Sequence, residues 1–193
     1  MKIAIATKNL GKLKEFQELS KGTDYELIPI PEDIKELPPE TGETFYENAL
    51  IKAKFISEVL GIPAIGDDSG LEVDVLNGEP GVYSARYSDS GRDEDNCIKL
   101  LESLEGIEAP QRVARFKCCL VGFFDGKIIK SFGALEGKIA RKFKGENGFG
   151  YNPIFITQDG LHLAELEKDQ KNLISHRSAA FTDLMKEIPF LAD

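Results

Sequence analysis

The sequence is poor in cysteine, histidine and tryptophan: its 193 residues contain three cysteines, two histidines and no tryptophan. Cys118 and Cys119 are adjacent within an apolar segment, an arrangement that suits neither a disulfide framework nor a zinc site. We therefore expect reduced cysteines that fill the core.

Long hydrophobic runs are also missing. No stretch approaches the roughly 18 to 20 apolar residues that a membrane span needs. The apolar run near the amino terminus, residues 3–6, is too short for a secretory signal. We expect a cytoplasmic protein without a membrane partner. The length and an ordinary globular composition predict a single domain over residues 1–193.

Positive charge is scarce, since 24 lysines and arginines face 33 aspartates and glutamates and leave a formal net charge of -9. This balance opposes binding along a nucleic-acid backbone, which requires clustered positive charge. No nucleic-acid partner is expected. A small polyanion can still bind where a divalent metal and a local basic pocket neutralise it.

Hydrophobic periodicity predicts an α/β fold. Residues 2–7 have the pattern of a buried strand, and a turn and a helix follow them. Thr44 and Glu47 predict a capping box at the start of a long helix that ends at Gly61. Asp125-Gly126 joins two strand-like runs and predicts a hairpin. A mixed rather than purely parallel sheet with flanking helices follows.

The segment after the long helix is predicted as two short strands, residues 62–65 and 71–76, joined by the acidic turn Gly66-Asp67-Asp68-Ser69-Gly70. Carboxylates at such a turn are well placed to bind a metal or to act in catalysis. Further along, the pattern predicts a helix near 93–104, short strands near Ile154 and Leu163, and a final helix over about 175–188.

The first candidate site is the segment from Thr7 to Lys12, where a strand leads into a helix amino terminus. Unpaired amides and the positive end of the helix dipole favour phosphate there, and Lys8 and Lys12 add charge. A P-loop is excluded, because Ala6 stands where that motif needs glycine and Leu13 where it needs serine or threonine. The alternative is an ordinary capped helix with solvated lysines.

The second candidate is acidic and comprises Glu40, Glu43, Glu47, Asp67 and Asp68. Carboxylate oxygens suit magnesium, which is usually shared between one or two carboxylates and the substrate phosphates. A neighbouring carboxylate can then activate water for attack on phosphorus. The alternative is a set of solvated acidic side chains.

The third candidate is the segment 171–178, in which Ser175 is a plausible cap and His176 and Arg177 fall in the first helical turn. The helix dipole disfavours positive charge there, and a bound anion would remove that conflict. Arg177 can contact phosphate or a base oxygen in a bidentate manner. A purely structural histidine is the alternative, and His162 has no functional context.

The fourth candidate is the glycine-rich loop 145–153. Its glycines permit close backbone approach, and Phe149 and Tyr151 can stack on a nucleotide base. The alternative is a tight turn packed by these two rings.

Together these segments resemble the ITP/XTP pyrophosphatase family along nearly the whole chain. The resemblance is carried by six motifs in the right order: Thr7-Lys8-Asn9 with Lys12, Gly42-Glu43-Thr44-Phe45 with Glu47-Asn48-Ala49, Asp67-Asp68-Ser69-Gly70-Leu71, Pro80 to Tyr87, Gly148-Phe149-Gly150-Tyr151, and Ser175-His176-Arg177.

The resemblance implies an elongated α/β fold with two lobes around a central nucleotide-binding cleft, and a homodimer. It implies magnesium-dependent hydrolysis of deaminated purine nucleotides (ITP, dITP, XTP) to the monophosphate and pyrophosphate. Asp68 would be the catalytic base and a magnesium ligand, Lys12 a second catalytic residue, and Glu40 a second metal ligand. The substrate-binding residues it implies are Thr7, Lys8, Asn9, Leu10, Gly11, Lys12, Ser69, Phe149, Gly150, Tyr151, Asn152, Lys171, His176 and Arg177.

The chain departs from the family pattern at Asn152, where aspartate is usual. Asparagine both donates and accepts hydrogen bonds, so the ranking of ITP, dITP and XTP shifts if this residue contacts the purine. Two other functions stay open: a pyrophosphatase of the same fold for pyrimidine or modified nucleotides, and a nucleotide sensor without turnover.

Overall fold

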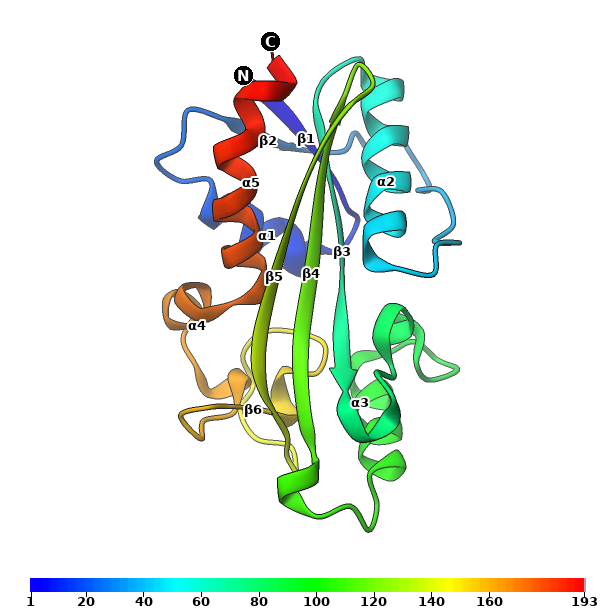
Figure 1. Ribbon diagram of the computed structural model, residues 1–193, viewed down its shortest axis with the longest axis vertical. Helices are drawn as coiled ribbons and strands as arrows, with labels where there is room; N and C mark the ends of the chain where they lie inside the picture. Colours follow the sequence, from blue (N-terminus) through cyan, green and yellow to red (C-terminus); the bar gives the residue numbers. More distant parts are fainter. Residues whose placement is uncertain (193) are drawn as a thin grey trace. The chain divides into compact units, whose positions relative to one another are not determined.

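The computed structural model describes residues 1–192, whose helices and strands are shown in Figure 1. These are β1 (Lys2–Ala6), α1 (Leu10–Leu19), β2 (Glu26–Pro29), α2 (Phe45–Leu60), β3 (Ala64–Val73), α3 (Asp93–Ser103), β4 (Val113–Phe124), β5 (Lys127–Ile139), β6 (Phe155–Thr157), α4 (Lys168–Ile174) and α5 (His176–Ala192). The strands have the order β2-β1-β3-β4-β5-β6 in one sheet.

The sheet is mixed, as predicted. β1 pairs in parallel with β2 and with β3, where Ala4 lies opposite Ala64. β5 pairs antiparallel with β6, and Gly137 lies opposite Thr157. The α/β prediction is therefore confirmed, with both strand directions in one sheet.

Two compact units make up the chain. The first unit contains Met1–Asp68, Cys118–Gly133 and the chain from Arg177 onward; the second contains Ser69–Lys117 and Ala134–His176. Each unit has its own apolar core. The chain passes from one unit to the other within strands β3, β4 and β5 and at the start of α5.

In the first unit, helices pack on both faces of the strands because successive strand residues point to opposite sides. Ile3 and Ile5 belong to a core with Phe16 of α1 and Phe181 of α5. The alternate β1 residues, Ala4 and Ala6, pack instead with Ile56 of α2. Short side chains on this second face leave room for α2 close to the sheet.

Helix α2 forms as its sequence predicts. The Thr44 side chain accepts from the Glu47 amide, the Glu47 carboxylate accepts in return, and Gly61 ends the helix in the left-handed conformation with φ of 64°. Gly66 of β3 lies so close that a Cβ there would come within 2.0 Å of the Ala49 carbonyl oxygen. Only glycine allows this contact between strand and helix.

The predicted hairpin between β4 and β5 is confirmed. Asp125 and Gly126 both have positive φ, 48° and 79°, the conformation of a two-residue turn that matches the strand twist.

The predicted acidic turn at 66–70 is wrong, because β3 runs without a break from Ala64 to Val73. Glycine, aspartate and serine are typical of turns. Here backbone pairing with β1 extends to Gly66, and β4 lies on the other side of β3. Partners on both edges keep the acidic segment extended.

Two smaller differences concern the end of the chain. The strand expected near Leu163 is a 3-10 turn, Leu163–Glu165, and the short helix α4 precedes the predicted final helix. Ser175 is the carboxyl-terminal cap residue of α4, directly before α5.

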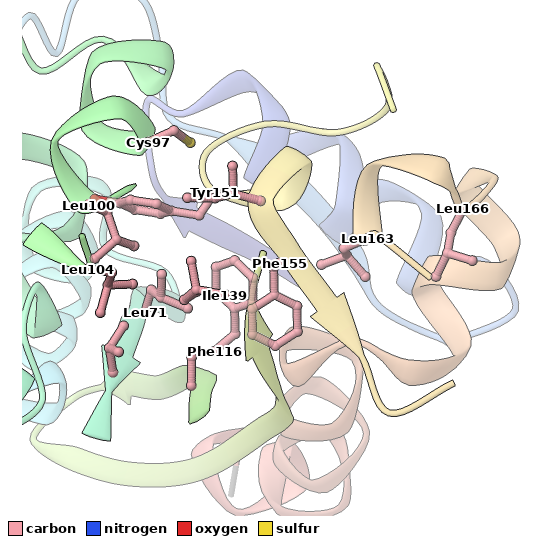
Figure 2. Close-up of a cluster of buried hydrophobic side chains, with 13 residues drawn as sticks. Leu71, Cys97, Leu100, Leu104, Phe116, Ile139, Tyr151, Phe155, Leu163 and Leu166 are labelled. Atoms are coloured by element: carbon pink, nitrogen blue, oxygen red, sulfur yellow. The ribbon is translucent and has the colours of Figure 1, made fainter. Parts of the chain in front are cut away.

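The core of the second unit, shown in Figure 2, joins strand residues such as Leu71 and Phe116 with Leu100 of α3 and Phe155 of β6. The ring centres of Phe116 and Phe155 are 4.7 Å apart. Tyr151 enters this core and donates its hydroxyl to the Ser84 carbonyl oxygen over 2.8 Å. Of the two aromatic residues in the glycine-rich loop, Tyr151 is therefore buried in the core, and Phe149 is half-buried.

All three cysteines are free and buried, as expected. Burial raises the pKa of Cys119 to about 12, so this thiol stays protonated. Within residues 1–192, no helix is long and apolar enough to cross a membrane.

Candidate functional site

The turn before α1 is built by its own polar side chains. Asn9 caps the helix by accepting from the Lys12 amide over 3.1 Å, and the Asn9 amide donates to Thr7 Oγ1 over 3.1 Å. The Lys8 and Leu10 side chains are exposed, and Gly11 is half-buried. The first predicted site is therefore a capped helix amino terminus, in which Lys8 is exposed and the Lys12 ammonium is bound to Asp67.

A buried lysine lies between two of the predicted acidic residues. The Lys52 ammonium on α2 is 2.6 Å from Glu40 Oε1 and 3.5 Å from Asp68 Oδ1. The side chains of Lys52 and Asp68 are only 6% and 7% exposed, and that of Glu40 is 27% exposed. The structure thus brings together the two predicted metal ligands.

The charges around Lys52 are strongly coupled. Burial raises the pKa of Asp68 above its ordinary value, and the positive charges of Lys52 and Lys12 oppose that rise. Burial alone would lower the pKa of Lys52, but the negative charges of Asp68 and Glu40 outweigh it, so the pKa is raised. Lys52 therefore stays charged, while Asp68 is the more basic of the two adjacent aspartates, as suits a proton acceptor.

Asp67 lies on the opposite side of β3 from Asp68. Its Oδ1 accepts from the Lys12 ammonium, and its Oδ2 accepts from Arg177 Nε over 2.6 Å. Burial alone would raise the pKa of Asp67, but Arg177 and Lys12 outweigh it and hold the pKa well below its ordinary value. Strand alternation has separated the two aspartates into different environments.

Arg177, in the first turn of α5, is 2% exposed and bound by two carboxylates. Its Nε donates to Asp67 and its Nη1 to Glu15 of α1. These carboxylates compensate for the unfavourable position of a cation at a helix amino terminus. The unfavourable interaction of this cation with the helix dipole, which a bound anion was expected to offset, is therefore offset by Asp67 and Glu15.

Glu43 and Glu47 have different roles from Glu40. One Glu47 carboxylate oxygen accepts from the amides of Glu43 and Thr44 over 2.7 and 3.0 Å. These bonds lower the pKa of Glu47. Glu47 is a helix cap, and the Glu43 side chain is exposed.

Asp68 and Glu40 are the two carboxylates of the first unit that could hold a magnesium ion. Within the described residues, no cluster of three or more histidine, cysteine, aspartate or glutamate side chains could hold a metal. Asp68 Oδ2 is buried and makes no hydrogen bond of normal geometry, although Asn48 helps to lower the pKa of this carboxyl. Magnesium commonly takes one or two protein carboxylates and completes its shell with water and phosphate, a requirement that Asp68 and Glu40 would meet.

In the second unit, three of the predicted substrate-binding residues make aromatic contacts. The Lys171 ammonium lies 4.9 Å from the centre of the Phe149 ring, and Lys171 is buried. The His176 ring stacks on Phe116 with ring centres 5.0 Å apart and an interplanar angle of 10°. Phe149 itself is half-buried, which leaves part of its ring accessible.

The glycine-rich loop is held from both sides. The Gly150 amide donates to Asp93 Oδ2 over 2.6 Å. Asn152 is 4% exposed, and its amide nitrogen fills the space beside Gly148, where an added Cβ would come within 2.0 Å of it. This nitrogen has no hydrogen-bond partner among residues 1–192. Ser69, the remaining predicted contact, is the first residue of the second unit and half-buried.

Two residues of the first unit were not singled out from the sequence. Lys52 follows Ala49 by three positions and precedes Ile56 by four, so it lies on the same face of α2 as these buried apolar residues. A lysine on a buried helix face is the signal that could have found it. Glu15, inside α1, gives no comparable signal.

Comparison with known proteins finds relatives over nearly the whole chain. The profile of the Ham1 family matches residues 3–187. The dITP/XTP pyrophosphatase of Symbiobacterium thermophilum is 42% identical over 100% of this chain and 97% of that protein. The enzyme of the same name from Bacillus subtilis is 46% identical over 94% of each.

Solved structures show the same similarity. The Ham1 protein of Coxiella burnetii has a TM-score of 0.88 at 39% identity, and that of Staphylococcus aureus has 0.86 at 41%. In both comparisons the match covers 98% of either chain. By sequence and by fold, the chain belongs to the Ham1 family.

Proposed function

We propose that the protein hydrolyses deaminated purine nucleoside triphosphates, ITP, dITP and XTP, to the monophosphate and pyrophosphate, with magnesium as cofactor. The observation that carries this proposal is the contact of buried Lys52 with buried Asp68 and half-buried Glu40 in the first unit. Relatives more than 40% identical over almost their whole length are named dITP/XTP pyrophosphatases, which supports the substrate class.

Asp68 is the proton acceptor in this proposal. Water attacks the α-phosphorus as one of its protons passes to the Asp68 carboxylate. The bond between the α-phosphorus and the oxygen that bridges it to the β-phosphorus breaks, and pyrophosphate leaves. The raised pKa of Asp68 favours acceptance of the proton, while Lys52 keeps the carboxylate ionised beforehand.

The cationic and amide groups near α1 bind the phosphates. Lys12 acts from the first turn of α1, where its backbone is fixed by Asn9, and Lys8 adds an exposed charge. The amides of the helix amino terminus attract the anion through the helix dipole. A magnesium ion held by Asp68 and Glu40 would neutralise further phosphate charge.

The second unit supplies base recognition. Phe149 offers a half-buried aromatic face, and Lys171 and His176 offer donors. Hypoxanthine and xanthine carry a 6-oxo group, which accepts from such donors, whereas adenine carries an amino group that is itself a donor. Sites of this kind discriminate by roughly 10⁴, so ATP is a poor substrate.

We propose a cytoplasmic homodimer that binds a small-molecule nucleotide and no nucleic acid. The net charge of -9 supports the last point, because it repels a phosphate backbone wherever no metal intervenes.

The direct test is pyrophosphate release from ITP, XTP, dITP, GTP, ATP and dTTP by the purified protein, with magnesium and with EDTA. Magnesium-dependent release from ITP, dITP or XTP with ATP nearly inert is the expected result. Preference for dTTP would reassign the base-binding residues to a pyrimidine enzyme. Binding of every nucleotide without turnover would favour a sensor.

The metal site has its own test. Glu40→Gln should raise the magnesium concentration needed for half-maximal rate by about tenfold, because one of two carboxylate ligands loses its charge. Glu36→Gln, in the same loop and exposed, is the matched control and should leave it unchanged. An unchanged magnesium requirement in Glu40→Gln would remove Glu40 from the metal site.

A further inference from the structure

Asp67 connects two cations that come from distant parts of the sequence. Lys12 lies in the first turn of α1 and Arg177 in the first turn of α5, and both donate to the one carboxylate of Asp67 on β3. The Asp67 side chain is fully buried, and Cys118 Sγ lies 3.7 Å from its Oδ2. Each carboxylate oxygen of Asp67 thus faces a charged donor.

Lys12 is consequently fixed at both ends. Its backbone amide is bound by the Asn9 side chain, and its ammonium is bound by Asp67. The Lys12 side chain nevertheless remains 14% exposed. A lysine side chain has a flexible four-carbon stem, so an unanchored ammonium would sample many positions. Anchoring removes that freedom before substrate binds, which is the condition for electrostatic preorganisation.

We propose that Asp67 is a positioning residue that acts through Lys12: it fixes the ammonium at the phosphate-binding turn and takes no part in holding metal. This inference rests on the proposed function only for the choice of substrate in its test. Asp68, one residue later on β3, faces α2 and Lys52 instead. Because successive strand residues point to opposite faces, Asp68 is available as the proton acceptor and Asp67 positions Lys12.

A double-mutant cycle on kcat/KM for ITP tests the proposal. Asp67→Asn and Lys12→Met should each lower kcat/KM by on the order of 10², and the double variant should lose hardly more than either single one, because both remove the same anchored ammonium. A merely structural role for Asp67 predicts losses that multiply to about 10⁴, and that result would overturn the proposal.

Lys8→Met is the matched control. It removes the same charge from the same turn, but at an exposed side chain. Its effect should multiply with that of Asp67→Asn. If Lys8→Met showed the same non-additivity as Lys12→Met, the coupling would reflect general charge, and the specific anchoring of Lys12 would be refuted.

Two further measurements keep the test decisive. If Asp67→Asn does not fold, Asp67→Glu retains the charge and moves the carboxylate by one methylene; a loss of at least tenfold in kcat/KM is expected, and full activity would overturn the proposal. If the wild-type protein does not hydrolyse ITP, the proposed function fails. The same cycle is then measured on the affinity for inorganic tripolyphosphate by calorimetry, where additivity again refutes the anchoring.

Discussion

The ammonium of Lys52 lies 3.5 Å from Oδ1 of Asp68, and both side chains are almost fully buried. An isolated charge of either kind would be strongly disfavoured at this depth, but the pair offsets most of that cost. Asp68 can therefore stay ionised in a partly desolvated position, where a carboxylate is more basic than in water. This relationship leads to the first prediction.

Lys52→Met should lower kcat by about 10² at neutral pH and move the acid limb of the pH-rate profile upward. Activity requires ionised Asp68 and is lost as pH falls through its pKa. Lys52 lowers that pKa, so its removal raises the pH at which activity disappears. The measurement is the pH dependence of pyrophosphate release from ITP.

Lys54→Met is the matched control for this experiment. Lys54 lies on the same helix, but its side chain is 56% exposed and it pairs with Glu58 at 3.9 Å. Such a surface pair contributes little. An acid limb at the same pH in Lys52→Met and Lys54→Met would show that Lys52 does not set the ionisation of Asp68.

Asp68→Asn should abolish turnover, with a fall of at least 10³ in kcat, because the amide cannot accept a proton from water. The variant should still bind ITP, since the helix amino terminus, Lys8 and Lys12 are unchanged. Stopped assays with high enzyme concentration measure the rate, and calorimetry measures binding. Near-normal turnover would exclude Asp68 as the proton acceptor.

Thr44→Ala should destabilise the protein by about 1 kcal/mol without altering the magnesium requirement, because it removes the hydroxyl that caps α2. Denaturant unfolding measures the first effect and metal titration of activity the second. Thr41→Ala, at an exposed residue in the preceding loop, is the control.

Glu47→Gln tests the same cap from the other side. Its carboxylate is bound to two backbone amides, so the substitution should affect stability and leave magnesium dependence unchanged. A metal requirement that rose with Glu47→Gln would return this residue to the candidate ligands.

Asn152→Asp should change the ratio of kcat/KM for ITP to that for XTP by about tenfold. The Asn152 amide nitrogen is buried and has no partner within residues 1–192, so a purine carbonyl is a suitable acceptor. Aspartate cannot donate. An unchanged ratio would assign Asn152 to packing against Gly148, where its amide already lies.

Local features of the fold follow from local sequence. The strand and helix at the amino terminus, the capping box of α2, its end at Gly61 and the Asp125-Gly126 hairpin all depend on residues a few positions apart. The family resemblance also rests on local sequence, because it depends on six short motifs and on their order along the chain. The identities of Asp68 and Lys12 as candidates also follow from such motifs, whereas Glu40 was a candidate as a carboxylate in the loop before Gly42.

The environment of these residues was decided by tertiary structure. The segment 66–70 has the composition of a turn, yet pairing with neighbouring strands keeps it extended as part of β3. Only that extension sends Asp67 to one face and Asp68 to the other. Lys52 and Glu15 join the site through packing of α2 and α1, and Arg177 through the start of α5. Ionisation depends on burial and on charges brought together from distant positions, and both arise only when the chain has folded.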